Sequence, residues 1–163
     1  MRKFCLTIIV LAGFSKALFA QFGNSASEMQ TYTDRETGNT ITILTDTLKN
    51  DRFLYQTDPM WTHDGKYLLF RSSSRANDKK IERTLPNGEK RSWTPTQIYF
   101  IEMATGQIIQ ATEGPDLGSA FLANKSNRMF ISRKEKEDWN MYVMDLDKFF
   151  ADVKKGKVGK PTA

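Results

Sequence analysis

Short apolar runs separated by turn residues dominate the chain from about residue 33 onward. They are strand-length and rich in β-branched and aromatic residues, a composition typical of β-structure. The runs are Thr40–Leu44, Phe53–Tyr55, Tyr67–Phe70, Gln97–Met103, Gln107–Ile109, Arg128–Ile131 and Met141–Met144. Glycines at Asp64-Gly65 and Thr105-Gly106 stand where tight turns need a positive φ. The pattern therefore predicts an all-β meander of antiparallel strands.

One segment has helical spacing. Between Asp147 and Lys155, the side chains of Phe149, Phe150 and Val153 fall on one helical face behind an aspartate cap. A single short helix is therefore expected near the end of the chain.

Two stretches repeat internally. Gly65–Arg71 matches Asn127–Arg133 at an offset of 62 residues, and Ile98–Ile101 matches Met141–Met144 at an offset of 43. The difference places an insertion of about nineteen residues in the first copy, at residues 76–95, whose central Asn87-Gly88 predicts a protruding hairpin. Without the insertion, a four-strand unit repeats every 43 residues, which is the period of a β-propeller blade.

The length of the chain limits this fold. Its 163 residues hold about three units, whereas propellers close with about 4–8 blades. We therefore predict a partial β-propeller of about three four-stranded blades, over residues 33–163, with an inserted hairpin. The missing C-terminal blades of a longer polypeptide would be its first partner.

The N-terminal segment has a different character. Residues 1–20 begin with Arg2 and Lys3, continue as an apolar run and end at Ala20, the order of a secretory signal peptide. The run is too short for the ~20 residues of a membrane span. Cleavage near Ala20/Gln21 and a periplasmic or secreted location are expected, with residues 21–32 as a polar linker.

Charge and rare residues exclude several classes of protein. The net charge of +5 comes from both ends of the chain, and residues 21–150 hold 17 basic and 18 acidic residues. Nucleic-acid binding is therefore not expected, because it needs a basic face. One cysteine and one histidine exclude an internal disulfide framework and a Cys/His zinc site.

Several motifs resemble known propellers. Asp58–Arg75, with its Asp64-Gly65-Lys66 turn, resembles the WD40-like repeat of TolB and its relatives. Thr31-Tyr32-Thr33-Asp34, Arg52-Phe53-Leu54-Tyr55-Gln56 and Ala111-Thr112-Glu113-Gly114 occur in the order and spacing of the N-terminal blades of oligogalacturonate lyases. This second resemblance covers about residues 30–146, apart from the insertion.

The resemblance implies a seven-bladed enzyme that cleaves pectin-derived oligogalacturonides by β-elimination. It also implies a divalent metal, manganese, held by histidines and a glutamine in later blades. No catalytic or metal-binding residue can therefore be assigned here, and this chain alone is expected to be inactive. Relatives often carry a histidine where this chain has Asp51, just before the Arg-x-x-Tyr segment Arg52–Tyr55.

Two residues are candidates for binding an anionic oligosaccharide. Arg52 and Tyr55 flank a short strand, and an arginine there can pair with a uronate carboxylate. The alternative is a surface charge and a core aromatic. The segment from Arg71 to Arg91, with seven basic and three acidic residues, either reaches toward an anionic glycan or is a solvated hairpin. For His63 a solvated turn is favoured over a ligand contact.

Three functions follow from these features. The first is an exported enzyme of the oligogalacturonate lyase type. The second is a non-catalytic, TolB-like propeller that serves as a periplasmic binding scaffold. The third is the propeller that precedes a serine-hydrolase domain, which a downstream G-x-S-x-G motif would mark.

Overall fold

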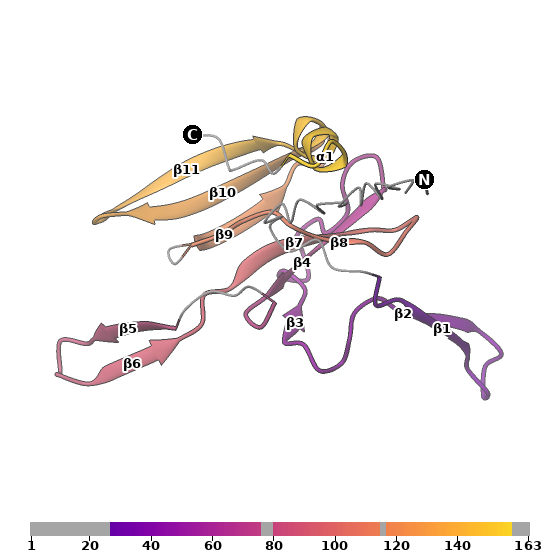
Figure 1. The fold of residues 1–163 in the computed structure, drawn as a ribbon, viewed down its shortest axis with the longest axis horizontal. Helices are drawn as coiled ribbons and strands as arrows, with labels where there is room; N and C mark the ends of the chain where they lie inside the picture. Colours follow the sequence, from indigo (N-terminus) through magenta and orange to yellow (C-terminus); the bar gives the residue numbers. More distant parts are fainter. Residues whose placement is uncertain (1–26, 76–79, 115–116, 158–163) are drawn as a thin grey trace, which may run out of the picture.

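Antiparallel strand pairs make up the four sheets of the computed structural model (Figure 1). The structure describes residues 27–75, 80–114 and 117–157, so the expected signal peptide lies outside it. The prediction of an all-β fold is confirmed.

The first large sheet has four strands in the order β3 (Asp51–Arg52), β4 (Tyr67–Ser72), β7 (Gln97–Glu102) and β8 (Ile108–Gln110). Successive side chains of a strand point to opposite faces, and in β4 and β7 both faces are apolar. Both strands are therefore buried on both sides. The glycines of the flanking turns adopt the predicted positive φ, 69° at Gly65 and 71° at Gly106.

The edge of this sheet that β3 forms is interrupted after Arg52. The strand expected at Phe53–Tyr55 is not formed: β3 ends at Arg52. The chain returns to β4 at Met60, whose carbonyl oxygen accepts a hydrogen bond from the N–H of Leu69, and at Trp61, which bridges Leu68. The side chains of Phe53 and Tyr55 are 56% and 67% exposed. Since Phe53 and Tyr55 bury little surface, they do not hold this segment in the sheet, and residues 53–59 form no strand.

The second large sheet has three strands, β9 (Leu117–Leu122), β10 (Arg128–Glu135) and β11 (Asp138–Asp145). The helix α1 (Leu146–Lys154) follows β11 and confirms the predicted helix, one residue earlier at each end. Its cap is Asp145, whose side chain accepts a hydrogen bond from the backbone N–H of Lys148.

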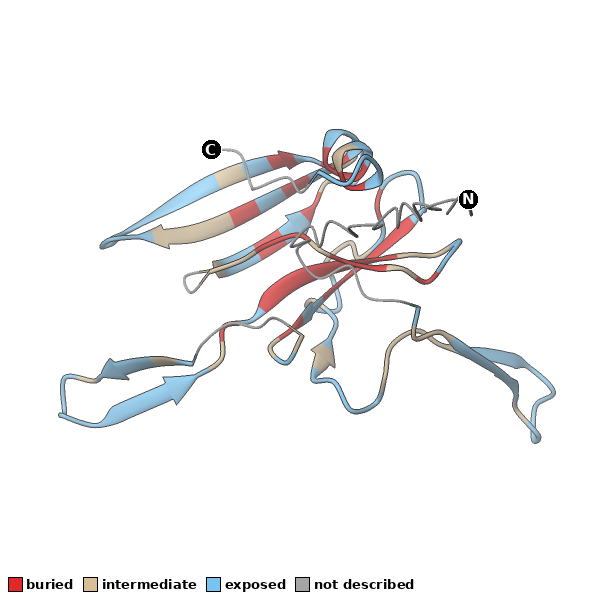
Figure 2. Ribbon diagram, in the orientation of Figure 1, coloured by how far each residue is buried: buried red, intermediate tan, exposed pale blue. Residues whose placement is uncertain are grey.

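An apolar layer joins the two sheets face to face (Figure 2). Strands β4, β7 and β8 contribute one side, strands β9, β10 and β11 the other, and α1 closes the rim. Phe150 of α1 stacks on Tyr67 with ring centroids 3.5 Å apart and packs edge-on against Phe100. The sheets are thus stacked as consecutive blades of a partial propeller, as predicted.

The strand register corrects the repeat by one residue. The Trp61–Leu68 bridge corresponds to the Leu122–Met129 pair of the second sheet, so the first block of the repeat is offset by 61 residues and not 62. A slip of one residue moves every side chain to the other face. Met129 is therefore the counterpart of Leu68, which faces away from the second sheet, and not of Tyr67, which faces it.

Two hairpins extend from the sheets (Figure 1). Strands β1 (Gln30–Thr33) and β2 (Thr40–Ile43) form one, so the expected linker of residues 21–32 is too long at its C-terminal end. Strands β5 (Ile81–Thr84) and β6 (Lys90–Trp93) form the other, which confirms the predicted hairpin in the insertion, with Gly88 at φ 83° in its turn. The three expected units thus have two, four and three strands in the described part of the chain.

The Phe150→Ala variant tests the role of α1 in joining the sheets. It removes a buried ring, and we expect the free energy of unfolding of the full-length protein to fall by about 3 kcal/mol or more. Urea denaturation provides the measurement. The matched control, Phe121→Ala, removes a ring that is 45% exposed and is expected to cost about 1 kcal/mol or less. Equal losses would contradict a structural role of the helix.

Candidate functional site

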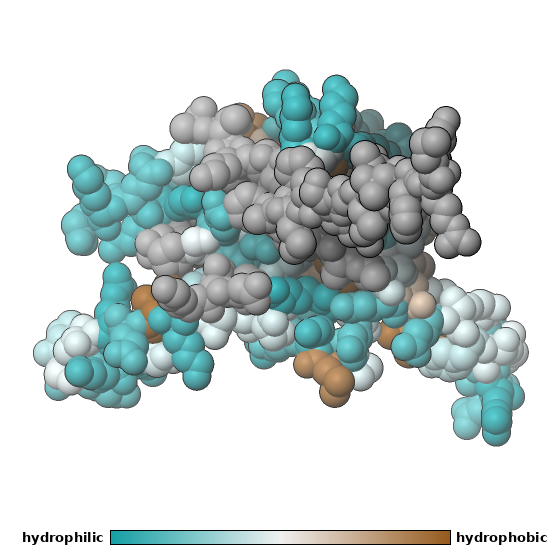
Figure 3. Space-filling view, viewed as in Figure 1, coloured by the Kyte–Doolittle hydropathy of each residue, from teal (hydrophilic) through white to brown (hydrophobic). Residues whose placement is uncertain are grey.

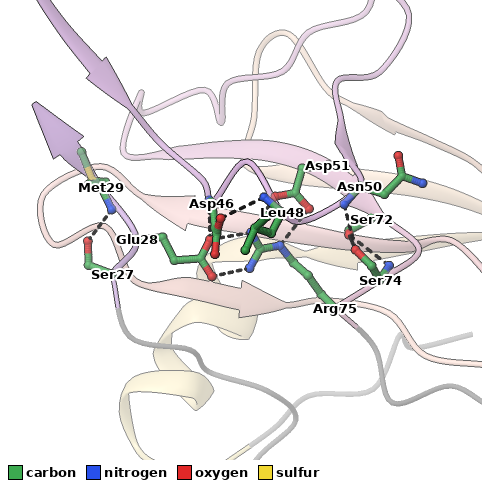
Figure 4. A network of polar contacts seen from close by, with 10 residues as sticks. All are labelled: Ser27, Glu28, Met29, Asp46, Leu48, Asn50, Asp51, Ser72, Ser74 and Arg75. Atoms are coloured by element: carbon green, nitrogen blue, oxygen red, sulfur yellow. Dashed lines mark hydrogen bonds and ion pairs between the residues drawn. The ribbon is translucent and has the colours of Figure 1, made fainter.

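A buried ion-pair cluster ties the N-terminal segment to the first large sheet (Figure 4). The side chain of Arg75 is 5% exposed and donates hydrogen bonds to both carboxylate oxygens of Glu28, at 2.6 and 2.9 Å, and to those of Asp51, at 2.5 and 2.8 Å. Its guanidinium carbon also lies 5.4 Å from the ring centre of Phe70. The cluster fixes the position of β3, which carries Asp51.

The charges in this cluster satisfy one another. The hydrogen bond from Arg75 lowers the pKa of the Glu28 carboxyl from 4.5 to about 2. Burial works to lower the pKa of the Arg75 guanidinium, but the hydrogen bonds to Glu28 and Asp51 outweigh burial and raise it. Because both carboxylates are already engaged by Arg75, the cluster serves to position β3 rather than to bind a ligand.

Next to the cluster lies an open hollow of about 460 Å³. It is formed where β3, the end of β4 and the base of the inserted hairpin meet. Its lining is basic, aromatic and hydroxyl-bearing: Asn50, Arg52, Arg71, Ser73, Trp93, Thr94 and Thr96.

Two arginines face each other in this hollow. Arg52 and Arg71 are direct cross-strand partners of β3 and β4, so their side chains leave the same face of the sheet. Like charges directly opposite each other destabilise a sheet. Within residues 27–75, 80–114 and 117–157, no carboxylate forms an ion pair with either arginine. A bound anion would relieve this repulsion.

Asn50 holds one of the arginines in place. Its side-chain oxygen accepts a hydrogen bond from Nε of Arg52 at 3.2 Å, and its side-chain nitrogen donates to Ser73 Oγ at 2.9 Å. No hydrogen bond joins the terminal guanidinium nitrogens of Arg52 to another described residue, and a guanidinium group has the geometry for bidentate binding of a carboxylate.

The indole of Trp93 adds an aromatic surface to the charged one. It is 39% exposed and lines the same hollow. A carboxylate between two guanidinium groups beside an exposed indole is an arrangement that suits an acidic sugar, whose ring is apolar on one face and polar at its edge. The hydroxyls of Thr94 and Thr96 and the side chain of Asn50 can hydrogen-bond the remaining edge.

The two residues predicted from the sequence to bind substrate are separated in the structure. Arg52 lies in the hollow, whereas Tyr55 does not line it and projects from the loop after β3. The alternative view of Tyr55 as a core aromatic is wrong, because the side chain is 67% exposed.

Sequence reasoning missed Arg71 and Trp93. Arg71 entered the sequence reasoning only as the first residue of the basic segment that ends at Arg91. The strand pairing and the hairpin base that bring Arg71 and Trp93 to Arg52 are seen only in the structure.

His63 lies in an exposed turn, as expected. One of its ring nitrogens, Nδ1, is 3.1 Å from the carbonyl oxygen of Asn124, in the corresponding turn of the second sheet. Among the residues that the structure describes, no three histidine, cysteine, aspartate or glutamate side chains come together to hold a metal ion. These residues therefore do not fit the manganese site that the resemblance implies. No described helix has the length and apolar character needed to span a bilayer.

Comparison with known proteins supports the fold. Neither the protein-family models nor the curated proteins give a match. A solved structure described as oligogalacturonate lyase in complex with manganese superimposes on this chain with a TM-score of 0.55 and 23% sequence identity. The superposition covers 80% of this chain and 30% of that one. At this identity the likeness shows a shared propeller-type fold, and this chain spans less than a third of the length of the lyase.

The Arg71→Gln variant tests whether the arginine pair is kept for binding. Removing one of two opposed like charges should raise the free energy of unfolding by about 0.2–1 kcal/mol while weakening the binding of digalacturonate to the full-length protein. Denaturation and calorimetric titration give the two values. The control, Arg35→Gln, removes an exposed arginine in the β1–β2 turn and should leave the binding unchanged. An Arg71 variant that binds normally would show that the hollow is not the site.

The stability of the cluster around Arg75 should depend on pH. Since the pKa of Glu28 is depressed in the folded chain, its stabilising effect is present above about pH 4.5 and is lost as the pH falls toward about 2. We expect the free energy of unfolding, measured by urea titration, to decrease over this range and the Glu28→Gln variant to show a shallower decrease. Glu137→Gln, at a glutamate that is 93% exposed, should behave as the wild type. If both variants have the wild-type slope, the ion pair does not contribute.

Proposed function

We propose that this chain forms N-terminal blades of an exported propeller enzyme of the oligogalacturonate lyase type, acting on pectin-derived oligogalacturonides. The observation that carries the proposal is the pair of opposed arginines, Arg52 and Arg71, which line an open hollow and form no ion pair with a carboxylate among the residues that the structure describes. The fold shared with a solved oligogalacturonate lyase supports it, as do the sequence motifs between Thr31 and Gly114. The basic, then apolar, N-terminal segment supports export.

The reaction explains why such a pair is useful. In β-elimination a base removes the C5 proton of a uronate, the C4–O4 bond breaks, and a C4=C5 double bond forms while the leaving oxygen takes up a proton. Negative charge accumulates on the carboxylate as the C5 proton leaves, so cations placed there stabilise the transition state. In this proposal Arg52 and Arg71 bind and orient a uronate carboxylate, and Asn50 positions Arg52.

The remaining chemistry is assigned to residues outside the described part of the chain. The lining of the hollow, with its arginines, tryptophan, threonines, serine and asparagine, includes no side chain that is an effective general base at neutral pH. The manganese that the lyase carries would likewise need ligands from elsewhere. We therefore derive no metal-dependent step from the residues of this chain.

The same lining favours a second candidate, a binding propeller without catalytic activity. A hollow that combines cations, hydroxyls and an exposed indole, but no base, is sufficient for recognition of an acidic sugar. In such a protein the chain would act as a periplasmic scaffold of the TolB-like kind.

Product formation separates the two candidates. The full-length protein, incubated with digalacturonate and manganese, is expected to release an unsaturated product that is followed by its ultraviolet absorbance. The Arg52→Gln variant should raise KM or lower kcat/KM by at least tenfold, because a charge-assisted contact contributes roughly 1.5–3 kcal/mol. Binding of digalacturonate without any product would contradict the lyase proposal and support the scaffold.

A further inference from the structure

The inserted hairpin β5–β6 has two different faces. Because side chains alternate along a strand, the register divides the hairpin cleanly. Ile81 opposite Trp93 and Arg83 opposite Arg91 share one face, while Glu82 opposite Ser92 and Thr84 opposite Lys90 share the other. We call the first face the arginine face of the hairpin.

The arginine face continues from the hollow. Trp93, at the base of the hairpin, lines the hollow together with Arg52 and Arg71. Along β6, Arg91 is the next residue on the same face, about 6.8 Å further out. The order from the sheet outward is therefore one opposed pair of arginines, an indole, and a second opposed pair of arginines.

The second pair repeats the electrostatic feature of the first. Arg83 and Arg91 are direct cross-strand partners, are exposed, and form no ion pair within the described part of the chain. Glu82 of β5 lies on the other face, and Glu89, two residues before Arg91 on the arginine face, lies at the turn, where it is hydrogen-bonded to Asn87. Opposed like charges in an isolated two-stranded hairpin are unfavourable, and a polyanion laid along this face would relieve the repulsion.

The hairpin also projects from the rest of the protein. It protrudes from the first large sheet, well away from the second (Figure 1), and its surface is mostly hydrophilic (Figure 3). All four residues of β6 are exposed, as are three of the four in β5. Its arginine face is thus accessible to a ligand much longer than the hollow.

We propose that the arginine face of the hairpin extends the hollow into a track for a polyuronide chain, so that the protein binds long acidic polysaccharides more tightly than dimers. One uronate would lie between Arg52 and Arg71, the next sugar would pack on Trp93, and later carboxylates would reach Arg83 and Arg91. The identity of the sugar acid rests on the proposed function, but the length dependence of binding does not require catalysis.

The test compares two double variants of the full-length protein, each lacking two positive charges of the hairpin segment. Arg83→Gln/Arg91→Gln removes the pair on the arginine face. The matched control, Lys80→Gln/Lys90→Gln, removes Lys80 just before β5 and Lys90 from the opposite face. All four side chains are exposed, so both variants should fold, which circular dichroism verifies.

Affinity is measured by calorimetry for digalacturonate and for polygalacturonate at a fixed, low salt concentration. We expect the arginine variant to bind polygalacturonate about tenfold more weakly than the wild type while keeping the wild-type affinity for digalacturonate. The lysine variant should stay within about twofold of the wild type for both ligands. The difference should shrink as salt is added, because exposed charges are screened.

Three outcomes would overturn the track. They are equal affinity of the wild type for polygalacturonate and digalacturonate, equal losses in the arginine and lysine variants, and equal affinity of the wild type for single-stranded DNA and polygalacturonate. Failure of the lyase proposal is distinguishable, since a protein that shows the expected length dependence but forms no unsaturated product keeps the track and loses the catalytic role.

Discussion

The apolar layer between the two large sheets is the constraint on which the other features depend. Strands β4 and β7 are apolar on both faces, so the first sheet is stable only when both are covered. The second sheet and α1 cover one face, and the aliphatic side chains of Leu44, Met60 and Met103 contribute to covering the other. Because both faces of the first sheet must be buried, other elements pack on each of them and form a stack. The polar groups lie at the sheet edges and in the hairpins.

The short strand β3 carries two charged side chains with different roles. One is neutralised within the structure, and the other lines the hollow. Asp51 and Arg52 are adjacent and therefore point to opposite faces. Asp51 lies on the face of Phe70 and is neutralised by Arg75, whereas Arg52 lies opposite Arg71 in the hollow. Two residues of opposite charge thus avoid neutralising each other because the pleat directs them apart. Removing either carboxylate from Arg75 would also loosen the strand that presents Arg52.

Sequence patterns predicted the elements whose structure depends mainly on residues close together in the chain. Six of the seven predicted apolar runs form strands, and the glycine turns, the capped helix and the inserted hairpin are also present. The strands β1, β3 and β9 were not among the predicted runs. The patterns failed where the structure of a segment depends on which other segments pack against it. The segment Phe53–Tyr55 looked like a strand because its apolar content is high, but only Leu54 packs against the core, and the side chains of Phe53 and Tyr55 are exposed.

The one-residue error in the repeat has the same origin, since similarity between Tyr67 and Met129 does not reveal which face of a sheet each covers. Arg52 could be selected from its position before an aromatic segment. Arg71 and Trp93 could not, because they meet it only through the register of β3 with β4 and the place where the inserted hairpin joins the sheet.

The inserted hairpin β5–β6 is attached to the sheet in a way that lets it vary during evolution. Ser72 and Gln97, at the two ends of the insertion, are register partners in β4 and β7 and are fully buried. The insertion therefore leaves and re-enters the sheet at a single point, and its length and sequence do not affect the pairing of the core strands. The inserted hairpin can therefore change in length and sequence without any change in the strands of the core.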